Sequence, residues 1–174
     1  EPVRLEYPRK DELQQGMIFS CCAVEAYDTE AWGVVITARC DLANSKAQIL
    51  NYVPVVRFED WIRRDGLELL RNRASAEVDG EVKALLGDLG ATSTVLLGTS
   101  LSQVIDTLLG DVNEKALKAL KPRSEKVQRR FRIVSEGSHS SIEDLRAEFP
   151  KLYSSLVREL MTHRLSGFYY LSRV

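Results

Sequence analysis

Cys40 and Asp41 are the residues of this sequence that suggest chemistry most directly. Cys40 ends the apolar run VVITARC, and Asp41 begins the turn-forming stretch DLANSK, which finishes at Lys46. A positive charge near a thiol lowers its pKa, and the resulting thiolate is a nucleophile. Cys40, Asp41 and Lys46 are therefore the candidate catalytic residues if the protein is a nuclease or a cysteine-dependent hydrolase.

The same residues also fit a structural role, which the sequence favours. A thiol is among the side chains most often found fully buried, so Cys40 would be the last core residue of a strand. Asp41 and Asn44 would accept hydrogen bonds from the backbone of the turn, and Lys46 would offset the charge of Asp41. On this interpretation Cys40→Ser lowers the stability by about 1–3 kcal/mol and leaves partner binding intact.

The residue types that hold metals or act as bases are sparse. A cysteine nucleophile needs a base, and the two histidines of the chain, His139 and His163, lie in no recognisable motif. Metal-ligand types also occur at Cys22, Cys40 and Asp41, which together with His139 would make four ligands. Their spacing matches no zinc signature. The sequence therefore predicts neither a metal nor another cofactor, and it favours a protein that is not an enzyme.

A basic segment from Lys115 to Arg132 is the second group of residues that suggests a function. It carries eight cations against Glu114 and Glu125. Such a patch neutralises phosphates even on a protein without a net positive charge. The candidate nucleic-acid-binding residues are Lys118, Arg123, Lys126, Arg129 and Arg130. The alternative is the solvated face of helices whose core side chains are Leu117, Leu120, Val127 and Phe131.

The elements that position these residues change in character along the chain. Residues 17–27, 32–40 and 47–58 resemble strands, and residues 59–163 are mainly helical, with Pro122 ending one of the helices. Residues 167–172 close the chain as a further strand. We therefore expect a single α+β domain over residues 1–174, in which residues 17–58 and 167–172 form a small, mostly antiparallel sheet or a partial barrel.

The last third of the chain has the clearest helical pattern. Ser140 and Glu143 have capping-box spacing, and Pro150 divides the apolar periodicity into two helices. Two helices followed by a strand are similar to a winged helix. The second helix carries few cations (Lys151, Arg158 and Arg164), so core packing is the favoured role.

Composition indicates a soluble protein that works inside the cell. The chain has 174 residues and a formal net charge of −1, so no overall field draws it to nucleic acid or to a membrane. No apolar run approaches the roughly 20 residues that a membrane span needs. Three cysteines, two of them adjacent, make a poor disulfide framework. We therefore predict a cytoplasmic protein without membrane contact.

Two stretches within residues 13–58 are similar to a known class of proteins, namely QQGMIFSC and GVVITARCDLANSKAQILNYVPVV. They resemble an uncharacterised class of bacterial proteins with a Gly-Asp-Ile-type strand start and a strand ending in Cys-Asp-(Ile/Leu). Here Met17 replaces the expected acid. The class tends to occur in mobile or phage-defence-type gene neighbourhoods, and the strands are also similar to SH3-like barrels, including MazF-type toxin barrels.

The predicted function is a non-catalytic binding or regulatory module of a bacterial defence or toxin-like system. The resemblance implies a bacterial cytoplasmic origin, and we expect a protein partner from the same operon. Nucleic acid is the other expected partner, bound at the Lys115–Arg132 segment. The enzyme that uses Cys40 and Asp41 stays the alternative.

Overall fold

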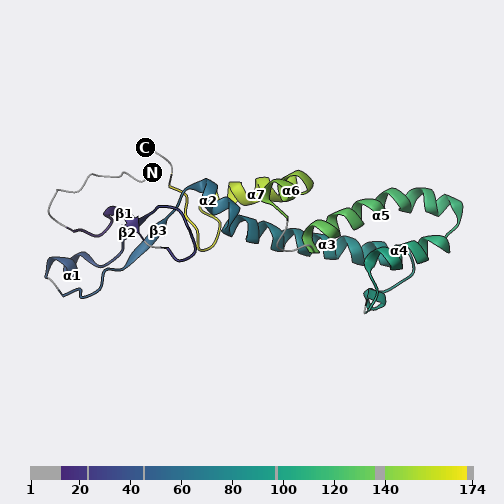
Figure 1. The fold of residues 1–174 in the computed structure, drawn as a ribbon, viewed down its shortest axis with the longest axis horizontal. Helices are drawn as coiled ribbons and strands as arrows, with labels where there is room; N and C mark the ends of the chain where they lie inside the picture. Colours follow the sequence, from purple (N-terminus) through teal and green to yellow (C-terminus); the bar gives the residue numbers. More distant parts are fainter. Residues whose placement is uncertain (1–12, 23, 45, 97, 136–139, 172–174) are drawn as a thin grey trace. The chain divides into compact units, whose positions relative to one another are not determined.

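The computed structural model describes residues 13–22, 24–44, 46–96, 98–135 and 140–171, and the chain divides into two compact units. The first unit comprises residues 1–64 and 169–174, and the second comprises residues 65–168. Unit 1 contains the sheet, and unit 2 is helical (Figure 1). The single domain over residues 1–174, whose two units would unfold together, stays a prediction.

Unit 1 is built on an antiparallel sheet of three strands in the order β1-β2-β3. Its strands are β1 (Ile18–Cys22), β2 (Ala31–Val35) and β3 (Tyr52–Val55). Val34 of the central strand lies opposite Ile18 on one side and Val53 on the other. The predicted α+β class with a small antiparallel sheet is confirmed.

Gly33 in the middle of β2 allows an aromatic ring to lie across the sheet. The register places Phe19 opposite Gly33, and the Phe19 ring occupies the space that a side chain at position 33 would need. The same ring meets Tyr52 edge to face, with the ring centroids 5.3 Å apart. A glycine within a strand often marks such a close approach.

The chain leaves the sheet earlier than the predicted strand 32–40. The backbone N–H of Ile36 donates to the carbonyl of Asn51, and Thr37 is buried with its hydroxyl 2.7 Å from the N–H of Asn51. Residues Arg39–Ala43 then form a short helix, α1. The prediction that Cys40 ends a strand is therefore wrong, because the apolar run continues past the last residue that pairs in the sheet.

The predicted barrel and the predicted last strand are also absent from the described part of the chain. The three strands form an open sheet. Residues 167–171 are not a strand, and Gly167 has a φ of 83°, which turns the backbone where a strand was expected. Phe168, Tyr169 and Tyr170 are β-type residues, yet the described part of the chain forms no strand there. The strand that a winged helix would place after its last helix is therefore absent from the described residues.

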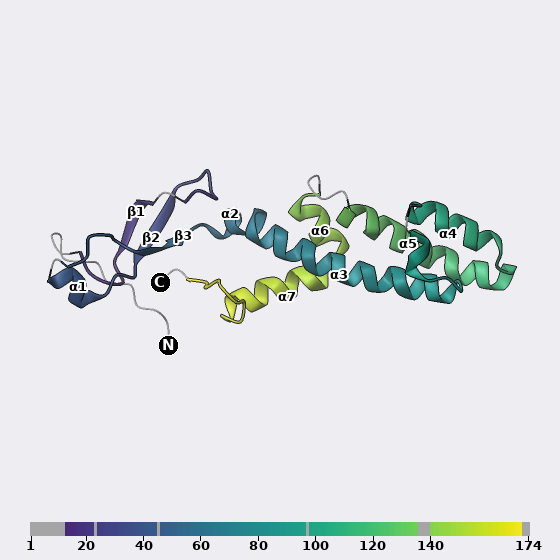
Figure 2. The ribbon, with the colours of Figure 1, turned by 90° about the horizontal axis from the view of Figure 1, so that it is seen from below.

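Unit 2 is organised around its longest helix, as Figures 1 and 2 show. Leu70, Ala74, Val78 and Val82 recur every four residues along this helix and are buried, which gives it one apolar stripe. The stripe packs against the helices that follow later in the chain. The helices of this unit are α3 (Asp65–Asp88), the 3-10 helix η1 (Ser93–Leu96), α4 (Leu101–Gly110), α5 (Glu114–Ser135), α6 (Ile142–Glu148) and α7 (Pro150–Met161), and α2 (Phe58–Arg63) precedes them in unit 1.

Two of the predicted helix boundaries differ from the structure, and one is confirmed. Pro150 begins α7 and separates it from α6, as predicted. Pro122 does not end a helix, because α5 continues through it. The capping box is formed by Ser141 and Asp144, one residue later than predicted, since Ser140 is buried and donates to the carbonyl of Ile133.

Two acidic groups of unit 2 make its stability sensitive to acid. The Arg73 guanidinium, bonded to both oxygens of Glu159 at 2.9 and 2.7 Å, holds the pKa of that carboxyl below its ordinary value of 4.5. The Ser141 hydroxyl likewise lowers the pKa of Asp144 below 3.8. Because both folded-state pKa values are lowered, the unfolded chain binds more protons in acid. Their stabilisation is complete above the ordinary values and is lost as the pH falls through the lowered ones.

We therefore expect the free energy of unfolding to fall below about pH 4.5. Glu159→Gln removes one of the two groups, so the variant should be less stable than the wild type at neutral pH and should approach it in acid. Denaturant unfolding between about pH 6 and pH 3 measures this. A constant difference between the two proteins over that range would contradict the assignment of Glu159.

Candidate nucleic-acid interface

Helix α5 carries the predicted basic segment as one continuous element. It begins after Asn113, whose side chain accepts from the N–H of Ala116 at 2.9 Å. Pro122 removes one backbone donor, yet the residue is exposed, so water can reach the carbonyl that loses its partner. The cations from Lys115 to Arg132 therefore share one helical frame and span about 26 Å along its axis.

The inner side of α5 lies against α3 and includes a charged residue. Ser124, Val127 and Arg130 are buried there, and Arg130 is only 5% exposed. A buried charge needs partners in the protein, because it has left water. This position removes Arg130 from the candidate surface, although its residue type and spacing matched the other cations.

Arg130 is surrounded by acidic and aromatic groups from two other parts of unit 2. It forms ion pairs with Glu77, at 2.7 Å, and with Glu81, both on α3. Its Nε lies 3.7 Å from a carboxylate oxygen of Glu148 at the end of α6. The guanidinium also lies 4.1 Å from the centroid of the Phe149 ring, a favourable cation–π contact. Arg130 thus joins α3 and α5 to the α6–α7 corner.

Two further predicted residues are exposed but already paired. Arg129 donates two hydrogen bonds of 3.0 Å to Glu148, and this contact raises its pKa. Arg123 pairs with Asp88 at the end of α3. A carboxylate that holds a guanidinium competes with a phosphate for it, so these two residues offer less to a ligand than their charge suggests.

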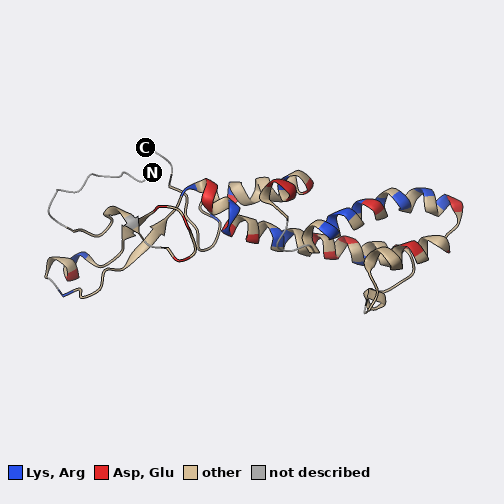
Figure 3. Ribbon diagram, in the orientation of Figure 1, with Lys and Arg blue, Asp and Glu red and all other residues tan. Residues whose placement is uncertain are grey.

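The remaining cations of α5 are exposed and make no ion pair with a described residue. Residues eleven positions apart lie about three helical turns apart, so they return to nearly the same side of the helix. Lys115, Lys118 and Lys121 form one set, and the residues eleven positions after them, Lys126, Arg129 and Arg132, form a second set on the same side, in which Arg129 is the member paired with Glu148. We call these six residues the α5 outer face. Figure 3 shows the cations distributed along the whole of α5.

The composition of the α5 outer face determines which ligands it suits. Five of its six cations are free of ion pairs with described residues, namely Lys115, Lys118, Lys121, Lys126 and Arg132. Glu114 at the start of the helix and Glu125 between the two sets are the acids of the same segment. An array of lysine and arginine side chains suits a ligand that carries a row of negative charges, such as a phosphate backbone. Of the predicted residues, Lys118, Lys126 and Arg129 lie on this face.

The predicted catalytic residues lie in unit 1, on and after α1. Cys40 is exposed, and its Sγ lies 3.7 Å from Oδ1 of Asp41. The side-chain amide of Asn44 donates to the carbonyl of Cys40 at 2.7 Å. The backbone N–H of Lys46 donates to the carbonyl of Asp41 at 2.9 Å. Asn44 therefore secures the end of this helical turn as a donor, whereas an accepting role was predicted.

Among the described residues of unit 1, the structure brings no histidine to Cys40, and the group that contacts its thiol is the carboxylate of Asp41. His139 lies outside the described residues, and His163 belongs to unit 2. Among the residues that the structure describes, no group of three His, Cys, Asp or Glu side chains is placed to hold a metal ion. The thiol of Cys40 contacts a carboxylate, whereas an activated thiolate is paired with a cation.

The exposure of Cys40 changes the expected effect of replacing it. Because Cys40 is exposed rather than buried, we expect Cys40→Ser to change the free energy of unfolding by less than about 0.5 kcal/mol. The earlier expectation of a larger loss depended on burial. Cys40 should also be alkylated in the native protein, while the buried Cys22 should not. Mass mapping after brief iodoacetamide treatment tests this, and protection of Cys40 would contradict it.

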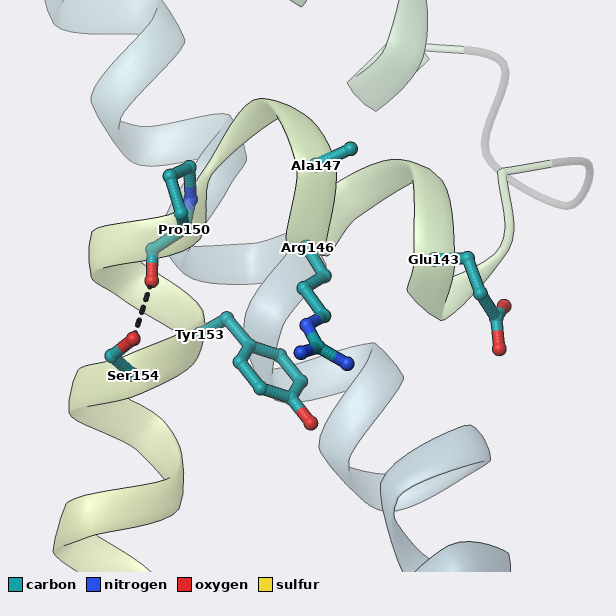
Figure 4. Close-up of a pocket in the computed structure, with 6 residues that line it drawn as sticks. All are labelled: Glu143, Arg146, Ala147, Pro150, Tyr153 and Ser154. Atoms are coloured by element: carbon teal, nitrogen blue, oxygen red, sulfur yellow. Dashed lines mark hydrogen bonds between the residues drawn. The ribbon is translucent and has the colours of Figure 1, made fainter.

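A hollow of about 530 Å³ lies at the corner between α6 and α7 (Figure 4). The Arg146 guanidinium covers the Tyr153 ring at 5.1 Å from its centroid, and the Ser154 hydroxyl donates to the carbonyl of Pro150 at 2.8 Å. Figure 4 shows Arg146 and Tyr153 pointing toward each other, while Glu143 points away from them. The polar groups of the hollow are thus largely engaged with one another.

No protein-family model, curated protein or solved structure matches this chain. The resemblance of residues 13–58 to a bacterial class therefore stays a prediction. Within the described ranges, no helix has both the length and the apolar character needed to cross a membrane.

Proposed function

We propose that this chain is a non-catalytic binding module that holds nucleic acid through the α5 outer face. The observation that supports the proposal most is the set of five exposed cations on one helix without ion pairs to described residues. No carboxylate of the described residues forms an ion pair with these five cations. In nucleic acids, ammonium and guanidinium groups bind the phosphate oxygens.

The attraction is local, because the whole chain carries a formal net charge of −1. At physiological ionic strength charges separated by more than about 8 Å are largely screened. Binding therefore depends on the phosphates that touch α5 and weakens as salt is added. Affinities that rest on backbone phosphates alone fall near 10⁻⁴–10⁻⁶ M, an order-of-magnitude range for non-specific binding at physiological salt.

Fluorescence anisotropy with a labelled DNA duplex tests the proposal. We expect binding at roughly 50 mM salt and release as the salt is raised toward roughly 200 mM. Variants should alter the lysines of the α5 outer face and leave Arg130 unchanged, since Arg130 is a core residue. Failure to bind either DNA or RNA at the lower salt concentration would reject the proposal.

A protein partner is the second candidate, and unit 1 favours it. Ile36, Ile49 and Val53 are 50%, 75% and 48% exposed, and exposed apolar side chains are typical of interaction surfaces when they cluster. A partner encoded in the same operon would agree with the predicted defence context. Co-purification with the product of a neighbouring gene, lost in Ile49→Asp but kept in Lys118→Gln, would support this candidate.

A further inference from the structure

We infer that the α5 outer face recognises the backbone of a nucleic-acid duplex and does not select base sequence. This inference rests on the proposed function and names the form of nucleic acid that is bound. It depends on the spacing of the cations, on the side chains that the face lacks, and on the position of Glu125.

The spacing of the two sets of cations suits two rows of phosphates. Lys115 and Lys126 hold equivalent positions in the two sets and are free of ion pairs with described residues, and eleven residues of α-helix separate them by about 16 Å. The major groove of B-form DNA is about 12 Å wide, with a row of phosphates on each edge. Two sets separated by slightly more than the groove width can therefore contact both edges. A single strand offers one row, with a lower density of charge.

The rigidity of α5 supports this match. Val127 and Arg130 hold the helix against α3, and Arg123 pairs with Asp88 near the end of α3. The distance between the two sets is therefore built into the fold before any ligand arrives. A preorganised spacing favours a ligand of regular geometry over a flexible chain.

The chemistry of the face favours a duplex over a single strand. Proteins that bind single strands stack the bases on aromatic side chains. Phe131 is the only aromatic residue in the α5 sequence, and it lies half-buried among inner-side residues. The face offers ammonium and guanidinium groups, which bind the outside of a duplex where the bases are already stacked.

The same chemistry argues against reading of base sequence. Base edges are read by forked side chains that enter a groove, such as arginine on guanine or asparagine on adenine. The fork of Arg129 is occupied by Glu148, and four of the other five cations are lysines. Contacts with the backbone position a protein on a duplex and carry no sequence information.

Glu125 has a defined effect in this arrangement. It is exposed and lies four residues after Lys121 and four residues before Arg129, between the two sets. Its carboxylate repels a phosphate that bridges the sets, so the wild type binds a duplex more weakly than the cations alone would allow. Replacing Glu125 by glutamine should therefore increase affinity, an effect that a merely structural role for α5 would not produce.

The test compares one duplex with its own strands. Anisotropy is measured at roughly 50 mM salt with a DNA duplex of about 24 base pairs, each separated strand, a duplex of scrambled sequence, and an RNA duplex. We expect the DNA duplex to bind at least about tenfold more tightly than either strand, with the scrambled duplex within about twofold. Glu125→Gln should tighten duplex binding about threefold, and Asp79→Asn, on exposed α3 surface, should leave it unchanged.

The outcomes separate this inference from the proposed function. Equal binding of strands and duplex, or a strong preference for one sequence, would overturn the inference and leave the proposed function standing. Competition by polyglutamate as effective as that by the duplex would show an acidic protein as the ligand and overturn both. Absence of binding to every probe would also overturn both. The RNA arm decides which of the two duplexes is preferred, and tighter RNA binding would overturn the groove-width argument.

Discussion

Arg130→Met is expected to lower the free energy of unfolding of unit 2 by about 3 kcal/mol. The side chain of Arg130 is 6% exposed and pairs with Glu77 and Glu81, with Glu148 at 3.7 Å. Removing the cation leaves Glu77 and Glu81 without the charge that compensates them, whereas Glu148 keeps its pairing with Arg129. It also removes the guanidinium that covers the Phe149 ring. Urea denaturation followed by circular dichroism measures the loss.

Matched variants separate the role of Arg130 from a general effect of charge. Arg132→Met removes the same group two residues later on the exposed side of α5 and should change stability by less than about 0.5 kcal/mol. Glu77→Gln and Glu81→Gln, added to Arg130→Met, should recover part of the loss, since replacing a whole buried ion cluster costs less than breaking it. Equal effects of Arg130→Met and Arg132→Met would contradict the buried network.

The second large effect concerns ligand affinity. Replacing Lys115, Lys118 and Lys121 together by glutamine is expected to weaken duplex binding at roughly 50 mM salt by at least about tenfold. The three ammonium groups are exposed, so their loss should leave the helix folded. The matched control replaces Lys83, Lys151 and Arg158, exposed cations of α3 and α7, by glutamine. Equal losses in both triple variants would mean that net charge, and not the α5 outer face, governs binding.

The sequence predicted the fold class because periodicity is a local property. The alternation in residues 17–58 and the helical period after residue 59 both depend on neighbouring positions, and the proline at position 150 acts on its own turn. The extent of the second strand was not predictable in this way. β2 ends before Ile36, where the N–H groups of Ile36 and Thr37 both donate to the single carbonyl of Asn51, a residue from a later part of the chain.

Proline at position 122 illustrates a similar limit. The residue costs a helix one hydrogen bond, which usually ends it. Here helix α5 as a whole packs against α3 and α4, and these tertiary contacts outweigh the local cost. A sequence pattern reports the hydrogen bond that proline costs its own helix and says nothing of the packing between helices.

The candidate site was predicted in outline but not residue by residue. The concentration of cations in residues 115–132 is visible in composition. Arg130 turns inward because carboxylates of α3 and α6 lie beside it. The sequence alone does not distinguish it from Lys115, Lys121 and Arg132, which have no such carboxylate among the described residues. One local signal existed, since Arg130 lies three residues after the apolar Val127 and thus close to the inner side of the helix.

The salt dependence of duplex binding tests the central claim most directly. Each phosphate contact contributes about −0.9 to the slope of log K against log salt for a B-form duplex. We expect a wild-type slope of about −4, which corresponds to the free cations of the α5 outer face, and a slope shallower by about 2 to 3 for the Lys115, Lys118 and Lys121 triple variant. The control triple variant at Lys83, Lys151 and Arg158 should keep the wild-type slope. A wild-type slope near zero, or an unchanged slope in the α5 variant, would contradict the proposal that this face binds phosphates.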